Sequence, residues 1–138
     1  MTAWMTGRIV VVPLDVSEFS INALELATGL VNDSANIRVV HVLPPIERPV
    51  LGEEYRNEQV RAALSAFIQE HGYQKMSITI LIGDPVKQIV QFADDSGAGL
   101  IVIPSHGRSM LTEMILGSTT NSVVRRANCP VLVVKPKK

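Results

Sequence analysis

Five short apolar runs, rich in valine and isoleucine, recur along this chain and limit the folds that it can adopt. The run Leu100–Pro104 is continuous and uncharged, which is typical of a strand buried on both faces of a parallel sheet. The predicted strands cover Arg8–Pro13, Asn36–Val42, Lys75–Ile82, Leu100–Pro104 and Pro130–Lys135.

Helical signals occupy the segments between these strands. A long amphipathic pattern spans Glu53–His71, and Asp84 with Pro85 combines an N-cap residue with a proline at the first helical position. Two further helices are predicted, from Glu18 onward and over Ser118–Ala127. Strands that alternate with helices predict an α/β fold, in which a single open twisted parallel sheet of Rossmann-like type carries helices on both faces.

The composition fits a single domain, residues 1–138, because 46% of the residues are apolar and can form a core. No apolar run approaches the roughly eighteen residues of a membrane span, and the N-terminus lacks a signal-peptide pattern, so we expect a cytoplasmic protein without a membrane partner. Lys and Arg balance Asp and Glu at 13 each, which argues against a nucleic-acid partner. The single Cys129 excludes an intrachain disulfide and is predicted to be a small core residue.

Polar residues follow two of the predicted strands. Residues 13–17, PLDVS, end the first strand, and residues 104–107, PSHG, end the fourth. Ligands of parallel α/β sheets bind beyond the carboxyl ends of the strands, at the point where the strand order reverses. We therefore expect the two segments to form one site if the first and fourth strands are neighbours.

The stretch Leu100–Ser118 has the spacing of a phosphate-binding loop. Its apolar run breaks at Pro-Ser-His-Gly, and Gly117 follows Gly107 after nine intervening residues. Ser118 and Thr119 then begin a helix, where free backbone N–H groups attract anions. In the alternative interpretation the two glycines serve only tight turns.

Five segments taken together are similar to one known family. They are VVPLDVSEFS, VVHV, the GDP turn, IPSHGRSMLTEMILGSTTNSVV and CPVLVVK, and they extend over nearly the whole length. On these motifs the chain resembles the universal stress protein family. The resemblance implies a fold of the adenine nucleotide α-hydrolase-like kind with the five-stranded sheet in the order 3-2-1-4-5, which makes the first and fourth strands neighbours.

The resemblance also implies a nucleotide site for ATP or another adenine nucleotide, with Mg²⁺. Asp15 would contact the ribose hydroxyls or the adenine edge, and Pro13 and Val42 would pack against the base. The glycines of the loop and the start of the following helix would face the phosphates. The candidate nucleotide-binding residues are Pro13, Asp15, Val42, Ile103, Pro104, Gly107, Arg108, Gly117, Ser118 and Thr119.

Several of these residues also have a plain structural interpretation. Asp15 could cap the first helix or a turn, and Arg108 could be an ordinary loop residue. His41 and His106 are interpreted as hydrogen-bonded structural imidazoles rather than catalysts.

Pro104 departs from the motif of the family's nucleotide-binding members, which is G-x-x-G, nine residues and G-[ST]. Gly107, Gly117 and Ser118 match this motif, but Pro104 stands in place of its first glycine. Proline has no N–H and cannot donate a hydrogen bond to the ligand from this position. Because a bond to a charged group contributes roughly 1.5–3 kcal/mol, we expect binding to be weakened roughly ten- to a hundredfold.

Three functions are consistent with these features. The first is a regulatory stress-response protein that binds an adenine nucleotide between the loops after the first and fourth strands. The second is a dimeric stress protein that binds no nucleotide and acts on unknown protein partners. The third is a weak ATPase, although the chain lacks the P-loop, metalloprotease and nucleophile-elbow motifs. No catalytic residue and no protein metal site are predicted.

The resemblance further implies a homodimer that forms through the C-terminal strand, residues 130–135. This segment, PVLVVK, is an apolar edge strand that would promote self-association if it were left uncovered.

Overall fold

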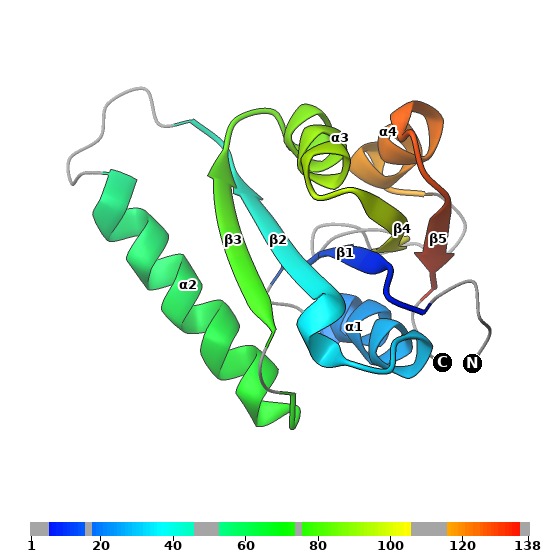
Figure 1. The fold of residues 1–138 in the computed structure, drawn as a ribbon. Helices are drawn as coiled ribbons and strands as arrows, with labels where there is room; N and C mark the ends of the chain where they lie inside the picture. Colours follow the sequence, from blue (N-terminus) through cyan, green and yellow to red (C-terminus); the bar gives the residue numbers. More distant parts are fainter. Residues whose placement is uncertain (1–5, 16–17, 46–52, 74–75, 106–115, 136–138) are drawn as a thin grey trace.

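The computed structural model of the chain describes residues 6–15, 18–45, 53–73, 76–105 and 116–135. Its centre is a parallel sheet in the order β3-β2-β1-β4-β5, which confirms the order implied by the resemblance (Figure 1). The strands are β1 (Ile9–Pro13), β2 (Ile37–Leu43), β3 (Ser77–Ile82), β4 (Ala98–Pro104) and β5 (Val131–Val134). The helices are α1 (Glu18–Leu30), the short 3₁₀ helix η2 (Ser34–Asn36), α2 (Glu53–Glu70), α3 (Pro85–Asp95) and α4 (Ser118–Arg126). None of these described helices is long and apolar enough to cross a membrane.

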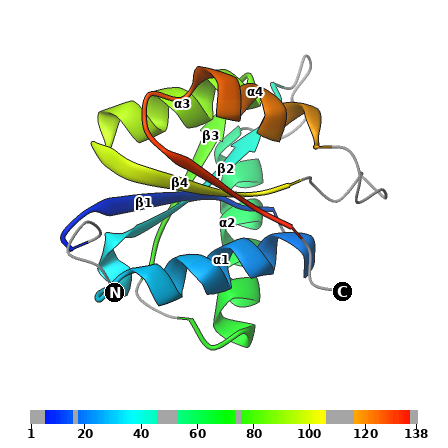
Figure 2. The same ribbon diagram turned by 90° about the vertical axis from the view of Figure 1, so that its right-hand side faces the viewer.

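Both faces of the sheet are buried under helices. Successive strand residues point to opposite faces, so Val12 of β1 packs in one core cluster with Leu24 of α1. Its neighbour Val11 packs in a second cluster with Ile89 of α3 and Val123 of α4. In Figure 2 the strands lie between α1 on one side and α3 with α4 on the other. The prediction of a sheet covered on both faces is therefore confirmed.

The observed elements agree with the predicted ones to within two residues at each end. The largest difference on a fully described element is at β4, which begins at Ala98 rather than Leu100. The pairing with β1 shifts by one residue there, which leaves Gly99 as the extra residue of a β-bulge. A Cβ at Gly99 would lie 2.8 Å from the side chain of Arg8, so a glycine is required for this close approach. Alanine and glycine are depleted in strands, so the sequence did not indicate that β4 begins at Ala98 and Gly99.

The 3₁₀ helix η2 was not predicted from the sequence. It is capped by Asp33, whose side chain accepts a hydrogen bond from the N–H of Ala35 at 2.9 Å. The predicted cap of α3 is present, because the Asp84 carboxylate accepts a bond from the N–H of Lys87 at 2.9 Å and Pro85 is the first helical residue.

Cys129 is predicted from the sequence to be a small core residue, but it is only half-buried and packs against the margin of the core cluster beneath α3 and α4. Burial raises the pKa of the Cys129 thiol, and the nearby carboxylate of Asp94 raises it further. The group therefore remains a protonated thiol at neutral pH.

Candidate functional site

The neighbouring strands β1 and β4 diverge at their carboxyl ends. The pairing between them ends at Val11 opposite Ile101, although β1 continues to Pro13 and β4 continues to Pro104. By contrast, β1 stays paired with β2 as far as Pro13, and β4 stays paired with β5 as far as Pro104. The divergence therefore falls where the strand order reverses, which is the position at which ligands bind in sheets of this kind.

The two prolines explain why the pairing ends there. N–H groups of successive strand residues point to alternate neighbours. Leu14 donates its N–H to a carbonyl of β2 at 3.0 Å, so the nitrogen of Pro13 faces β4. Ser105 donates to a carbonyl of β5 at 2.8 Å, so the nitrogen of Pro104 faces β1. The next two hydrogen bonds between β1 and β4 would need N–H groups that proline does not have, and a crevice opens between the strands.

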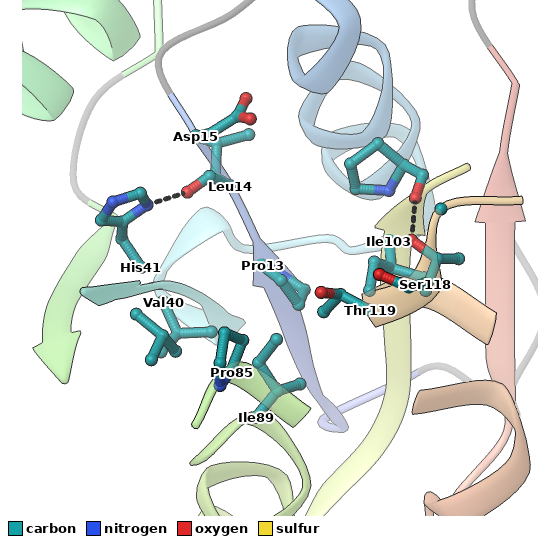
Figure 3. Close-up of a pocket in the computed structure, with 14 residues that line it drawn as sticks. Pro13, Leu14, Asp15, Val40, His41, Pro85, Ile89, Ile103, Ser118 and Thr119 are labelled. Carbon is teal, nitrogen blue, oxygen red and sulfur yellow. Dashed lines mark hydrogen bonds between the residues drawn. The ribbon is translucent and has the colours of Figure 1, made fainter. Parts of the chain in front are cut away.

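A cavity of about 260 Å³ lies in this crevice (Figure 3). Its walls come from the carboxyl ends of β1, β2 and β4 and from the first turns of α3 and α4. The size is near the lower end of the range for small-molecule sites, which begins at about 300 Å³. The lining residues are Pro13, Leu14, Asp15, Val40, His41, Val42, Pro85, Ile89, Ile103, Pro104, Gly117, Ser118, Thr119 and Thr120.

The cavity has an apolar wall and two separate polar ends. Val40 and the α3 residues Pro85 and Ile89 lie together along one side in Figure 3. Asp15 lies beyond the end of β1, whereas Ser118 lies apart from it at the start of α4, beside Ile103. This arrangement suits a ligand with a flat apolar part, a group that donates hydrogen bonds to a carboxylate, and an anionic group.

The anionic end is formed by the start of α4. Gly117 is the N-cap residue, and no side chain caps the helix there. The N–H groups of the first turn, which begins with Ser118 and Thr119, therefore point to a place suited to an anion. Two buried bonds hold this turn to the end of β4: Thr120 Oγ1 donates to the carbonyl of Pro104 at 2.7 Å, and the N–H of Gly117 donates to the carbonyl of Ser105 at 2.8 Å.

The structure brings eight of the ten candidate residues to the walls of one cavity. These eight are Pro13, Asp15, Val42, Ile103, Pro104, Gly117, Ser118 and Thr119. Gly107 and Arg108 lie outside the described residues, as does His106. The contacts of all ten residues with a ligand stay predictions.

Sequence reasoning missed the α3 wall of the cavity. The sequence predicts Pro85 only as the first residue of a helix, and Ile89 is not among the candidate residues. In a parallel α/β sheet, however, the first turns of the crossover helices lie at the same edge as the carboxyl ends of the strands. That rule could have placed Pro85 at the site.

His41 also lines the cavity, although it is not among the ten candidate nucleotide-binding residues. Its Nδ1 lies 2.7 Å from the carbonyl oxygen of Leu14, so the interpretation as a hydrogen-bonded imidazole is confirmed. The same ring nevertheless lines the cavity. A carbonyl oxygen only accepts hydrogen bonds, so Nδ1 carries the proton in this pair.

A doubly wound parallel sheet with a crevice at its switch point defines a Rossmann-like α/β protein. Within that class, the chain belongs to the universal stress protein family, because the model of that family matches residues 7–135. The universal stress protein MJ0531 of Methanocaldococcus jannaschii is 34% identical over 141 residues, which cover 94% of this chain and 83% of the relative.

Two solved structures are similar over almost the whole chain. MJ0577 of the same organism has a TM-score of 0.74 at 30% identity, and 99% of each chain is covered. In the sequence comparison, the match to MJ0577 is 38% identical but spans only 63% of this chain and 52% of that relative. The universal stress protein of Archaeoglobus fulgidus in complex with dAMP has a TM-score of 0.59 at 25% identity and covers 93% of this chain and 98% of its own.

The Thr120–Pro104 bond predicts a measurable stability effect. Thr120→Val leaves the buried carbonyl of Pro104 without this donor, so we expect the free energy of unfolding to fall by roughly 1–3 kcal/mol in urea titrations. Thr28→Val is the matched control, because Thr28 makes a similar bond to the carbonyl of Glu25 on the exposed face of α1. Equal losses for the two variants would contradict a special contribution of the buried bond.

Proposed function

We propose that this crevice binds an adenine nucleotide of the ATP type and that the protein is a cytoplasmic regulator that acts through protein partners. The observation that carries the proposal is the pairing of a carboxylate, Asp15, with an uncapped helix start, Ser118–Thr119, across one apolar cavity. A nucleoside phosphate has hydroxyls for the first, anionic oxygens for the second and a flat base between them.

Each part of the nucleotide has a matching wall. The base would lie against the apolar residues Pro13, Val42 and Ile103, and the ribose hydroxyls would donate to Asp15. The phosphates would accept from the first turn of α4 and from the loop that contains Gly107 and Arg108. The relative from Archaeoglobus fulgidus, which was solved with dAMP, supports an adenine nucleotide as the ligand.

Magnesium would enter this site with the phosphates. Among the residues that the structure describes, no group of three His, Cys, Asp or Glu side chains could hold a metal ion. Mg²⁺ commonly keeps most of its waters and binds phosphate oxygens with few protein ligands, so the described residues are compatible with an ion carried by the nucleotide.

Titration calorimetry with ATP, ADP, AMP and cyclic AMP tests the proposal. We expect binding of at least one of these nucleotides, and we expect Asp15→Ala to weaken it roughly ten- to a hundredfold, because a hydrogen bond to the carboxylate is lost. Asp33→Ala, which removes a carboxylate remote from the cavity, is the control. Absence of heat and of a thermal shift with all four nucleotides at millimolar concentration would leave the second hypothesis, a stress protein that binds no nucleotide.

The proline at position 104 predicts a gain of affinity on substitution. Its nitrogen faces the crevice side of β4, so Pro104→Ala restores a donor there and is expected to tighten ATP binding roughly tenfold or more. Pro104→Gly restores the donor and also removes the Cβ. An increase with glycine alone would assign the effect to space rather than to the N–H group, and no increase with either would contradict the predicted gain of a ligand bond at residue 104.

We also propose a homodimer that forms through β5, within residues 130–135. The two edges of the sheet differ: α2 packs on β3, and Arg61 Nη1 donates to the carbonyl of Ile78 at 2.6 Å. At the other edge, Leu132 of β5 is 36% exposed, and Val124 of α4 is 43% exposed. An edge protected by a helix and an arginine is a poor site for strand addition, whereas an uncovered apolar edge favours it.

A charge on β5 tests this interface. Leu132→Lys is expected to convert the dimer to a monomer in light scattering at tens of micromolar protein, because a lysine on an edge strand opposes strand pairing. Ala62→Lys places the same charge on the exposed side of α2, near the opposite edge, and should leave the mass unchanged. A monomeric wild-type protein, or a dimer that persists with Leu132→Lys, would contradict the proposed interface.

A further inference from the structure

The two peptide groups on either side of the Asp15 Cα are each held by a side chain. The carbonyl of Leu14 belongs to the peptide before Asp15, and it accepts from His41 Nδ1 at 2.7 Å. The carbonyl of Asp15 belongs to the peptide after it, and it accepts from Ser20 Oγ at 2.6 Å. Fixing both peptide planes fixes φ and ψ of Asp15, and these two angles set the direction in which its side chain leaves the backbone.

The sheet itself does not provide this support. Asp15 lies two residues beyond the end of β1, past the point at which pairing with β4 has stopped. Among the described residues, the last bond by which β1 continues its ladder in this direction is from the N–H of Leu14 to the carbonyl of Val40, at 3.0 Å. That bond orients the peptide before Leu14, and the described bonds to the carbonyls of the next two peptides come from side chains.

The two donors come from elements that are themselves fixed. His41 lies within β2, toward its carboxyl end, and is paired with Ile80 of β3. Ser20, in the first turn of α1, is only 1% exposed. Each donor is therefore pre-positioned, as is required of groups that hold a binding residue within a fraction of an ångström of its working geometry.

We propose that His41 and Ser20 are positioning residues for the nucleotide site: they orient Asp15 toward the ribose hydroxyls and contact the ligand's hydroxyls only through Asp15. The inference rests on the proposed nucleotide function. It adds that recognition of the ribose by Asp15 depends on hydrogen bonds from His41 of β2 and Ser20 of α1, two elements to which Asp15 itself does not belong.

Calorimetric titration with ATP and with 2′,3′-dideoxy-ATP isolates this effect, since the second probe lacks the hydroxyls that Asp15 is proposed to bind. Wild-type protein should bind ATP roughly tenfold or more tightly than the dideoxy probe, and Asp15→Ala should bring the ratio of the two Kd values close to one. His41→Phe keeps a ring but removes the donor, and Ser20→Ala removes the other donor. Each is expected to lower the ratio at least threefold, mainly by weakening ATP binding.

Rescue separates a positioning role from a purely structural one. In His41→Asn the side-chain amide nitrogen takes roughly the place of Nδ1 and remains a donor, so the wild-type ratio should be retained. His71→Ala is the matched control, because His71 Nδ1 also pairs with a backbone carbonyl, that of Phe67 at 2.8 Å, but its ring does not line the cavity. Thermal unfolding of each variant shows whether it remains folded at the temperature of titration.

The outcomes distinguish this inference from the function on which it rests. Absence of ATP binding by the wild type, or equal binding of the two probes, would overturn the proposed role of Asp15 and this inference with it. A wild-type preference that Asp15→Ala abolishes, but that His41→Phe and Ser20→Ala both leave intact, would overturn this inference alone. If His41→Phe and Ser20→Ala weaken the binding of ATP and of 2′,3′-dideoxy-ATP equally, this inference would also be overturned, because a general structural defect does not distinguish ribose from dideoxyribose.

Discussion

The ladder of hydrogen bonds between β1 and β4 stops at Val11 and Ile101 because the next two donors on that side are missing, at Pro13 and Pro104. A central strand normally excludes proline, since each one removes a ladder bond. Here both prolines are at the ends of their strands, and their nitrogens face the same interface. The sheet is consequently divided only at its carboxyl edge, and the cavity occupies the space that two further pairs of residues would have closed.

The division is stable because each strand end has another neighbour. Leu14 is bonded to the β2 side through both its N–H and its carbonyl, and Ser105 donates to β5. Each of these bonds gives a partner to a backbone group beside the crevice, which matters because an unpaired buried polar group costs roughly 1–3 kcal/mol. At the opening, β1 and β4 therefore stay attached to their outer neighbours β2 and β5, while the two apolar layers on the faces of the sheet hold the rest of it together.

The sequence allowed the order and type of every main element to be predicted, because the buried strands are short apolar runs and the helices carry their own period and caps. The family resemblance supplied the strand order, which periodicity alone does not contain. Other features depend on register. Successive residues of β1 direct their nitrogens alternately to β2 and β4, so the register decides which strand the nitrogen of Pro13 faces. The bulge at Gly99 depends on the close approach of the Arg8 side chain. The His41–Leu14 bond joins residues 27 apart and could be found only in three dimensions.

Residue 104 has opposite effects through its two backbone groups. Its nitrogen, which has no hydrogen, bonds neither to β1 nor to a ligand, whereas its carbonyl accepts from Thr120 and fixes the first turn of α4 beside the cavity. A glycine at this position would add a donor for phosphate or ribose, but it would also restore an N–H group able to continue the ladder toward β1. Proline therefore favours an open crevice at the expense of one ligand bond. The described donors for an anion are then concentrated on α4, whose placement depends on the carbonyl of that same proline.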